Sequence, residues 1–263
     1  MIRALYSAGS GMVAQQVNID NIAHNLANAN TVGFKARRSQ FQDLLYQTIS
    51  QPGAAATAQT AIPTGLQLGL GARASSNSII FQQGSFELTS NPLDMVIQGK
   101  GFFQIRRPSG ETAYTRAGQF HMDRDGNIVT QDGDALEPQI TIPAQAQNPT
   151  IAADGTVSYL LQGQTAAQVA GQIQLAGFVN PAGLNSLGRN LYAPTDASGE
   201  PQIGNPGGQE GLGSLMQGYV EMSNVSIVEE FIAMIVSQRA YEANTKVVRA
   251  ADEMYSQVNN MTR

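Results

Sequence analysis

The stretch SIVEEFIAMIVSQRAYEANTKVVRAADEMYSQVNNMTR, residues Ser226 to Arg263, decides the architecture of this chain of 263 residues. It contains neither glycine nor proline, whereas the whole chain has 27 glycines and 11 prolines. Ser226 followed by Glu229 is typical of a capping box at the start of a helix. Apolar residues then recur every seven positions, the spacing of a coiled coil, at Ala240, Val247, Met254 and Met261. The pattern predicts one helix of roughly 30 residues or more, about 45 Å long.

The first 30 residues predict a second helix. No proline occurs between Met1 and about Asn30. Apolar residues again recur every seven positions, with two more placed three positions later: Leu5, Met12, Ile19 and Leu26, then Ala8 and Ile22. Gly9 and Gly11 weaken this pattern, since glycine costs up to about 1 kcal/mol relative to alanine inside a helix. Two explanations stay open: the glycines allow a neighbouring helix to approach closely, or they belong to a fraying first turn.

The region between the helices, from about Thr31 to Gly218, is predicted to be rich in β-strands. It holds all 11 prolines and shows short alternating apolar runs separated by glycine-containing turns. Such turns favour hairpins because glycine adopts the positive φ that they require; they occur at Gly99-Lys100-Gly101, Asp125-Gly126, Asp132-Gly133 and Asp154-Gly155. Residues 50–78 are mainly Ala, Gln, Thr, Gly and Pro with a few spaced leucines. We expect them to form an extended arm or loop.

The order helix, β-rich region, helix predicts an α+β protein. A helix with a single apolar stripe is unstable alone in water, so we expect the terminal helices to pair with each other, to pack against other subunits, or both. The expected organisation is a discontinuous, coiled-coil-like helical domain from residues 1–30 and 224–263, a linker with an extended arm or β-hairpin over 31–78, and a central all-β domain over 79–223. A secreted adhesin would share the β-rich region but would not need apolar heptads at both ends.

Composition excludes several functions. Charged residues make up 13% of the chain, and its formal net charge is −5. A chain without basic clusters does not suit nucleic acid as a partner, and the absence of cysteine excludes disulfides and thiolate metal sites. We expect no membrane insertion, because no apolar run reaches about 18 residues, and no cleaved signal peptide at the N-terminus. A lightly charged, amide-rich surface instead suits a subunit that copies of itself cover.

No group of residues predicts catalysis, a metal or a cofactor. The segment Asp123–Asn127 resembles the start of a calcium loop, but the twelfth position, which requires glutamate, holds Asp134. We therefore interpret it as a hairpin turn. Gly99-Lys100-Gly101 lacks the third glycine of a dinucleotide site and is interpreted as a tight turn between strands. The only histidines, His24 and His121, lie in different predicted regions.

Three basic residues follow the first helix closely, at Lys35, Arg37 and Arg38. We expect their side chains to lie on the bare surface of the protein. The alternative is a set of inter-subunit salt bridges to acidic residues such as Glu229 and Glu230.

Several motifs of the chain resemble the rod and hook proteins that form the axis of the bacterial flagellum. They are NIAHNLANANTVGFK at 21–35, LDMVIQGKGFF at 93–103, YTRAG at 114–118, DGNIVT at 125–130, GYVEMSNV at 218–225 and QRAYEAN at 238–244. Together they span nearly the whole chain in the order of that family. The residues that carry the resemblance are Asn25, Asn28, Asn30, Thr31, Gly33, Phe34, Lys35, Gly99, Gly101, Phe102, Arg239, Ala240 and Tyr241.

The resemblance implies a structural subunit of a helical homopolymer, a straight and rigid hollow shaft that carries torque from motor to hook. The chain length and the insertion from Tyr46 onward indicate the distal-rod branch of the family, with a proximal-rod or hook-type paralogue as the alternative. The implied partners are other rod proteins below, the hook protein above, the P- and L-ring bushing around the shaft, and the type III export apparatus. The implied location is the basal body, from periplasm to outer membrane, and the family has no catalytic residues to carry over.

The helix stripes and the arm are the candidate assembly sites. We expect inter-subunit helix packing through Leu5, Met12, Ile19, Ile22, Leu26, Val236, Ala240, Val247, Ala250 and Met254. We expect the arm to lie along a neighbouring subunit and resist sliding, through Tyr46, Pro52, Gly53, Leu66 and Leu68.

Overall fold

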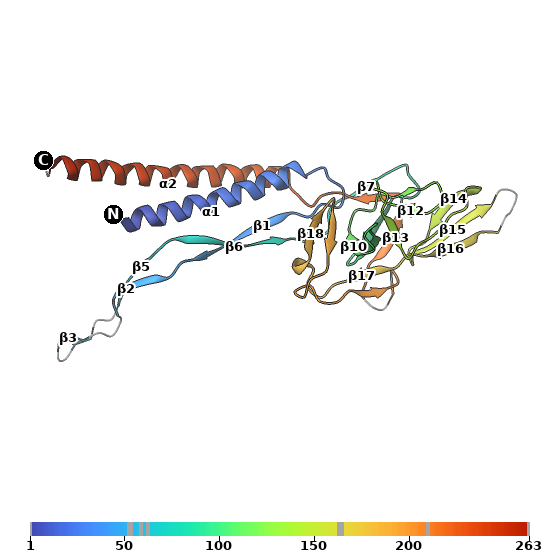
Figure 1. Ribbon diagram of the computed structural model, residues 1–263, viewed down its shortest axis with the longest axis horizontal. Helices are drawn as coiled ribbons and strands as arrows, with labels where there is room; N and C mark the ends of the chain where they lie inside the picture. Colours follow the sequence, from blue (N-terminus) through green and yellow to red (C-terminus); the bar gives the residue numbers. More distant parts are fainter. Residues whose placement is uncertain are drawn as a thin grey trace. The chain divides into compact units, whose positions relative to one another are not determined.

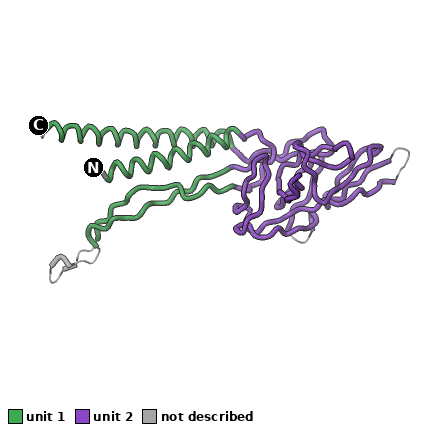
Figure 2. The backbone as a smooth tube through the Cα atoms, viewed as in Figure 1, with its two compact units in different colours: residues 1–27, 37–79, 226–263 green, residues 28–36, 80–225 purple. Residues whose placement is uncertain are grey.

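The computed structural model describes residues 2–51, 55–57, 60–61, 64–161, 166–208 and 211–261. The chain divides into two compact units, coloured separately in Figure 2. Unit 1 contains Met1–Ala27, Arg37–Ile79 and Ser226–Arg263, and unit 2 contains Asn28–Ala36 and Ile80–Val225. The sequence predicts a separate region over residues 31–78. In the structure this region is divided: the arm is grouped with the terminal helices, and residues 28–36 belong to the β-rich unit.

Two long helices form one side of unit 1. Helix α1 covers Ile2–Ala27 and helix α2 covers Ile227–Met261, with 26 and 35 residues. This confirms the two predicted helices and the start of the second one directly after Ser226. The helices lie side by side and antiparallel (Figure 1), since Met12 of α1 meets Thr245 and Asn18 meets Ser237.

The arm of unit 1 is a two-stranded antiparallel ribbon. Its root pairs β1 (Arg37–Asp43) with β6 (Ala72–Ile79), and its middle pairs β2 (Tyr46–Ser50) with β5 (Leu66–Gly69). Farther out, β3 (Ala55–Thr57) pairs with β4 (Thr60–Ala61). A two-stranded ribbon is marginally stable by itself in water, and here the strands β1 and β6 pack along α1.

Unit 2 is built on a nine-stranded sheet in which β9 is central. The sheet runs in the order β11-β12-β13-β9-β10-β19-β18, and β17 also pairs with β9 and with β20. The strand bounds are β9 Phe102–Arg106, β10 Thr112–Thr115, β11 His121–Met122, β12 Ile128–Val129, β13 Ala135–Glu137, β17 Leu175–Gly177, β18 Asn185–Gly188, β19 Leu191–Ala193 and β20 Gln202–Gly204. A short 3-10 helix covers Pro181–Gly183.

Smaller sheets complete unit 2. A three-stranded sheet contains β14 (Ala146–Ile151), β15 (Thr156–Leu161) and β16 (Gln168–Gln172). Two antiparallel pairs join distant parts of the chain: β8 (Met95–Gln98) with β21 (Ser214–Gln217), and β7 (Phe86–Leu88) with β22 (Tyr219–Glu221). These pairs hold the C-terminal end of unit 2 against segments that precede its central strand.

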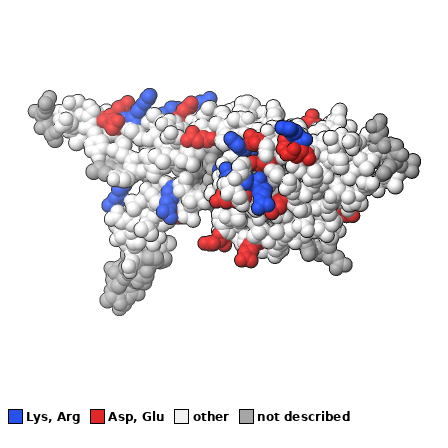
Figure 3. Space-filling view, turned by 45° about the vertical axis from the view of Figure 1, so that its right-hand side comes forward, with Lys and Arg blue, Asp and Glu red and all other residues white. Residues whose placement is uncertain are grey.

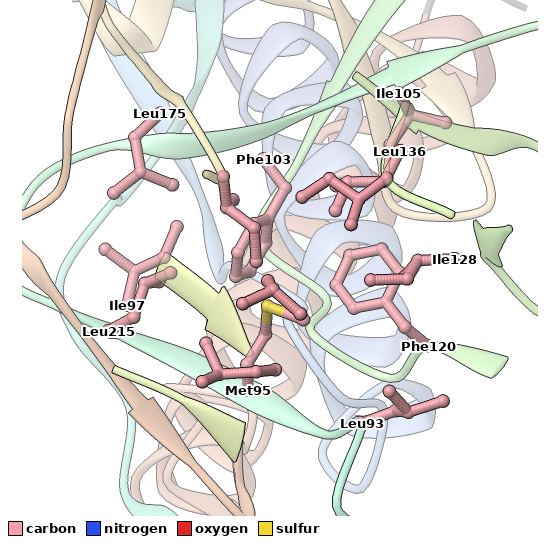
Figure 4. Close-up of a cluster of buried hydrophobic side chains, with 14 of the residues drawn as sticks. Leu93, Met95, Ile97, Phe103, Ile105, Phe120, Ile128, Leu136, Leu175 and Leu215 are labelled. Carbon is pink, nitrogen blue, oxygen red and sulfur yellow. The ribbon is translucent and has the colours of Figure 1, made fainter. Parts of the chain in front are cut away.

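The hydrophobic core of unit 2 lies between β8, β9 and their neighbours (Figure 4). Met95 and Ile97 come from β8, and Phe103 and Ile105 come from β9; all four are fully buried. The Phe103 ring meets Phe120 edge to face, with centroids 5.2 Å apart. Alternating apolar residues therefore point to one core from several strands, as the sequence pattern predicts.

Three of the four predicted hairpins are confirmed and one is wrong. Antiparallel pairs flank the turns at Asp125-Gly126, Asp132-Gly133 and Asp154-Gly155. Gly99-Lys100-Gly101 instead connects β8 and β9, which belong to different sheets. The physical reason is Arg116, whose guanidinium donates hydrogen bonds to the Gly99 carbonyl at 2.8 Å and the Gly101 carbonyl at 2.7 Å, so the segment curls around this side chain.

Candidate assembly surface

Small and polar residues make much of the contact between α1 and α2. Asn18 donates a hydrogen bond to the Ser237 hydroxyl at 2.8 Å, and Ser237 is buried. Gly11 faces Asn244, because a Cβ at Gly11 would lie 3.0 Å from the Asn244 amide nitrogen. Ala251 is also buried. Close approach of α2 thus accounts for Gly11, one of the two explanations that the sequence leaves open.

Many of the large apolar side chains of α2 are exposed, whereas Met234 and Val248 are half-buried. Val236 is 62% exposed, Val247 45% and Met254 47%. Ala250 is exposed as well, and Ala240 is half-buried. The heptad pattern that starts at Ala240 does not include the most apolar part of this surface, which lies nearer the start of α2. Its residues recur at a helical spacing of three and four positions, a signal that the sequence does contain. They are all exposed: Ile227, Val228, Phe231, Ile232 and Ile235.

Helix α1 divides its apolar residues between two faces. Ile22 is buried, and the other residues of the predicted seam are half-buried within unit 1: Leu5, Met12, Ile19 and Leu26. Tyr6, Val13 and Val17 form a second, exposed stripe at helical spacing. An open apolar groove borders this stripe, lined by Leu5, Tyr6, Gly9, Ser10 and Val13.

A row of asparagines on α1 anchors both α2 and the arm. Asn25, 2% exposed, exchanges two hydrogen bonds with the backbone of Arg37 at 2.9 Å each and donates a third to the Glu230 carboxylate at 3.0 Å. Asn21 donates to the Ser39 hydroxyl and accepts a hydrogen bond from Asn77 at 2.6 Å. The spacing of Asn18, Asn21 and Asn25 places them along one side of the helix, so this row fixes the root of the arm.

Partial burial raises the pKa of the Glu230 carboxyl above its ordinary value of 4.5, although the hydrogen bond from Asn25 and the charge of Arg38 oppose the rise. Glu230 therefore interacts with residues of its own unit. Arg38 is exposed and Arg37 is half-buried.

The arm exposes apolar residues along both of its strands. Tyr46 is 55% exposed, Leu66 52% and Leu68 36%. Leu45 and Ile49 are exposed too. Pro52 and Gly53, also predicted to belong to this surface, lie outside the described residues.

The family motif near the start of unit 2 contains a buried ion cluster, and the predicted surface position of Lys35 is wrong. The Lys35 ammonium lies 2.6 Å from Glu221, and the Arg116 guanidinium lies 2.8 Å from the other oxygen of the same carboxylate. Lys35 is 1% exposed. No local sequence pattern reveals this burial, because Glu221 is 186 positions away in the chain.

Burial by itself would raise the pKa of the Glu221 carboxyl. The charges of Arg116 and Lys35 outweigh that effect and hold the pKa below its ordinary value of 4.5. Glu221 is therefore ionised at neutral pH and neutralises part of the charge of its two partners.

The remaining motif residues have mainly structural contacts. Gly33 has φ +72, and a Cβ there would lie 2.5 Å from the Ala117 nitrogen, so glycine is required. Phe102 is buried in an aromatic cluster with Phe81 and Phe178. Positions of the others are as follows: Phe34 buried, Asn28 and Thr31 half-buried and hydrogen-bonded to each other, and Asn30, Arg239 and Tyr241 exposed.

Neither the distribution of charged side chains nor the placement of possible metal ligands indicates a catalytic or metal site among the described residues. On the face shown in Figure 3, charged side chains are scattered among uncharged ones. Among the described residues no group of three or more His, Asp or Glu side chains could hold a metal ion. None of the helices in the described ranges is both long enough and apolar enough to span a membrane. The features that stand out are the unpartnered apolar faces of the two helices and the arm, which define an assembly protein.

The comparisons with known proteins agree with this class. Residues 5–35 match the family "Flagella basal body rod protein", residues 96–159 match "Flagellar hook protein FlgE/F/G D1 domain", and residues 216–261 match "Flagellar basal body rod FlgEFG protein C-terminal". The flagellar basal-body rod protein FlgG of Caulobacter vibrioides is 50% identical over 96% of this chain and 97% of its own length. FlgG of Borreliella burgdorferi is 45% identical and FlgG of Bacillus subtilis 40% identical, each over the full length of both chains.

The chain belongs to the FlgG family of flagellar basal-body rod proteins. It is a structural component of the flagellar basal body.

Proposed function

We propose that this protein is the subunit of the distal rod and polymerises into a straight, rigid, hollow shaft that transmits torque from the motor to the hook. The observation that carries the proposal is the outward apolar face of α2, with Val236 62% exposed. A monomer gains nothing from exposing such a face, whereas each large apolar side chain that a contact fully buries contributes about 1.5–3 kcal/mol.

The helices supply the contact and the arm supplies stiffness. A helical polymer needs a heterologous contact whose rotation does not close into a ring. The exposed stripe of α1, with Tyr6 and Val13, and the exposed face of α2 are two different apolar surfaces on one subunit, which suits contacts of this kind. The arm, through Tyr46 and Leu66, lies along a neighbour and resists sliding.

The position of the shaft decides its partners. We propose that the polymer continues from other rod proteins and is followed by the hook protein, inside the P- and L-ring bushing between periplasm and outer membrane. The subunit reaches this place through the type III export apparatus. It acts without catalytic activity, since its work is mechanical.

Polymerisation of the purified protein after nucleation, observed by electron microscopy, tests the proposal. Wild type should form straight tubes, and Val236→Asp should stay monomeric because the contact would bury a charge. Val169→Asp is the matched control: this valine of β16 is exposed to a similar degree, 67%, but lies in unit 2. Circular dichroism should show folded monomers for both variants. Normal tubes from Val236→Asp would refute the assignment of this face to assembly.

A further inference from the structure

Glu221 contacts three other segments of unit 2. Its carboxylate accepts hydrogen bonds from the Lys35 ammonium at 2.6 Å, the Arg116 guanidinium at 2.8 Å and the Gly84 amide at 3.0 Å. Its side chain is 0% exposed. Its own carbonyl accepts a hydrogen bond from the Gly33 amide at 2.7 Å. We define Lys35, Arg116 and Glu221 as the latch cluster. Of these three residues, Glu221 comes last in the sequence.

The neighbours of Glu221 make the same connections. Asn224 accepts a hydrogen bond from the Ala36 amide at 2.7 Å and donates to the Ile80 carbonyl at 2.8 Å. The Met222 amide donates to the Ser85 carbonyl at 2.9 Å. Backbones approach so closely here that a Cβ at Gly84 would lie 2.0 Å from the Met222 carbonyl oxygen. Residues 219–224 therefore fill a narrow space between the entry segment, residues 33–36, and residues 80–86.

The charges of the latch cluster are unbalanced without Glu221. Lys35 and Arg116 are both nearly fully buried, at 1% and 6% exposed. Burial lowers the pKa of the Lys35 ammonium below its ordinary value of 10.5, and the charge of Glu221 opposes that shift. Both side chains have other partners: Arg116 donates to the carbonyls of Ile97, Gly99 and Gly101, and Lys35 donates to the Gln82 carbonyl at 2.7 Å. Among the described residues, however, Glu221 is the one carboxylate with which either of them forms an ion pair. Burial of two like charges without a counter-charge is strongly unfavourable.

We propose that Glu221 is a closing latch: unit 2 forms its core first, and docking of residues 219–224 against the entry segment is the last step of its folding. Until Glu221 arrives, Lys35 and Arg116 stay hydrated and the entry segment stays open. This inference does not depend on polymerisation.

Kinetics of the full-length chain test the latch. If Glu221 docks after the rate-limiting step, Glu221→Gln should leave the refolding rate of unit 2 unchanged within about twofold and accelerate unfolding by about tenfold or more. Ile105→Val is the matched control in the core, and it should slow refolding measurably. A refolding rate that falls in proportion to the whole loss of stability in Glu221→Gln would overturn the proposal.

Native-state hydrogen exchange gives a second, independent readout on wild type, and it remains available if Glu221→Gln does not fold. The Gly33 and Met222 amides, which bond to Glu221 and Ser85, should exchange through an opening that leaves the amides of β9 and β10 protected. Glu221→Asp keeps the charge on a shorter side chain. It should accelerate exchange of the Gly33 and Met222 amides and leave exchange of the β9 and β10 amides unchanged. Equal exchange of both groups of amides through global unfolding would refute a latch that closes separately.

Discussion

Substitution of Gly71 tests whether the arm is anchored to α1. Gly71 lies between β5 and β6 and has φ +118, a conformation that other residues rarely adopt. A Cβ at this position would lie 2.0 Å from the Ser10 hydroxyl oxygen, 3.2 Å from the Ser10 Cβ and 3.3 Å from the Ser7 Cα. The Gly71→Ala methyl group must therefore displace the arm from the helix or the Ser10 side chain from its place.

The expected cost has two parts. The positive φ costs about 1–2 kcal/mol for a residue with a Cβ, and the overlap with Ser10 adds about 1–3 kcal/mol, the usual range for overpacking. The sum is about 2–5 kcal/mol, so opening of the arm root should become at least about 30 times more frequent.

Hydrogen exchange measures this opening directly. The Leu44 amide donates to the Gly71 carbonyl at 2.8 Å and the Ala72 amide to the Ser10 hydroxyl at 3.3 Å, so both amides report on the anchor. Ser10→Ala alone should cost roughly 1 kcal/mol, the value of a hydrogen bond. The double variant should cost about 1–3 kcal/mol less than the sum of the single ones, because the overlapping oxygen is gone. Additive costs, or unchanged exchange in Gly71→Ala, would refute the anchor.

Two further predictions concern the arm and the pH dependence of unit 1. Deletion of residues 46–63 should give polymers that bend like a hook, because the arm no longer resists sliding between subunits; rods that stay as straight as wild type in electron micrographs would contradict its role. The raised pKa of Glu230 means that the folded state holds this proton more tightly than the unfolded state, so the contribution of Glu230 lowers the free energy of unfolding as pH rises above 4.5. Glu230→Gln should therefore be more stable than wild type at neutral pH and lose that advantage below pH 4.5, as measured by urea denaturation; a gain that is independent of pH would exclude titration of Glu230 as its cause.

Part of the exposed apolar face of α2 could be found from the sequence because it depends on local periodicity. Val236, Val247 and Met254 recur at helical spacing, and all three are exposed on α2. For α1 the sequence does not show which apolar residues are buried within the subunit and which are exposed. Met12 and Ile19 have the same spacing as an inter-subunit seam, but they are half-buried inside unit 1 because α2 and the arm cover that side.

The sequence by itself determined the two terminal helices, the β-rich region between them and the arm of residues 50–78 as a separate feature. Each of these depends on neighbouring residues: the absence of glycine and proline after Gly218, the seven-residue spacing, and the turn glycines. Only the tertiary structure decided which helix face remains exposed, that the arm root bonds to Asn21 and Asn25, and that Lys35 is buried against Glu221. These contacts join residues far apart in the chain, so neither partner carries a local signal of the other, and packing alone brings them together.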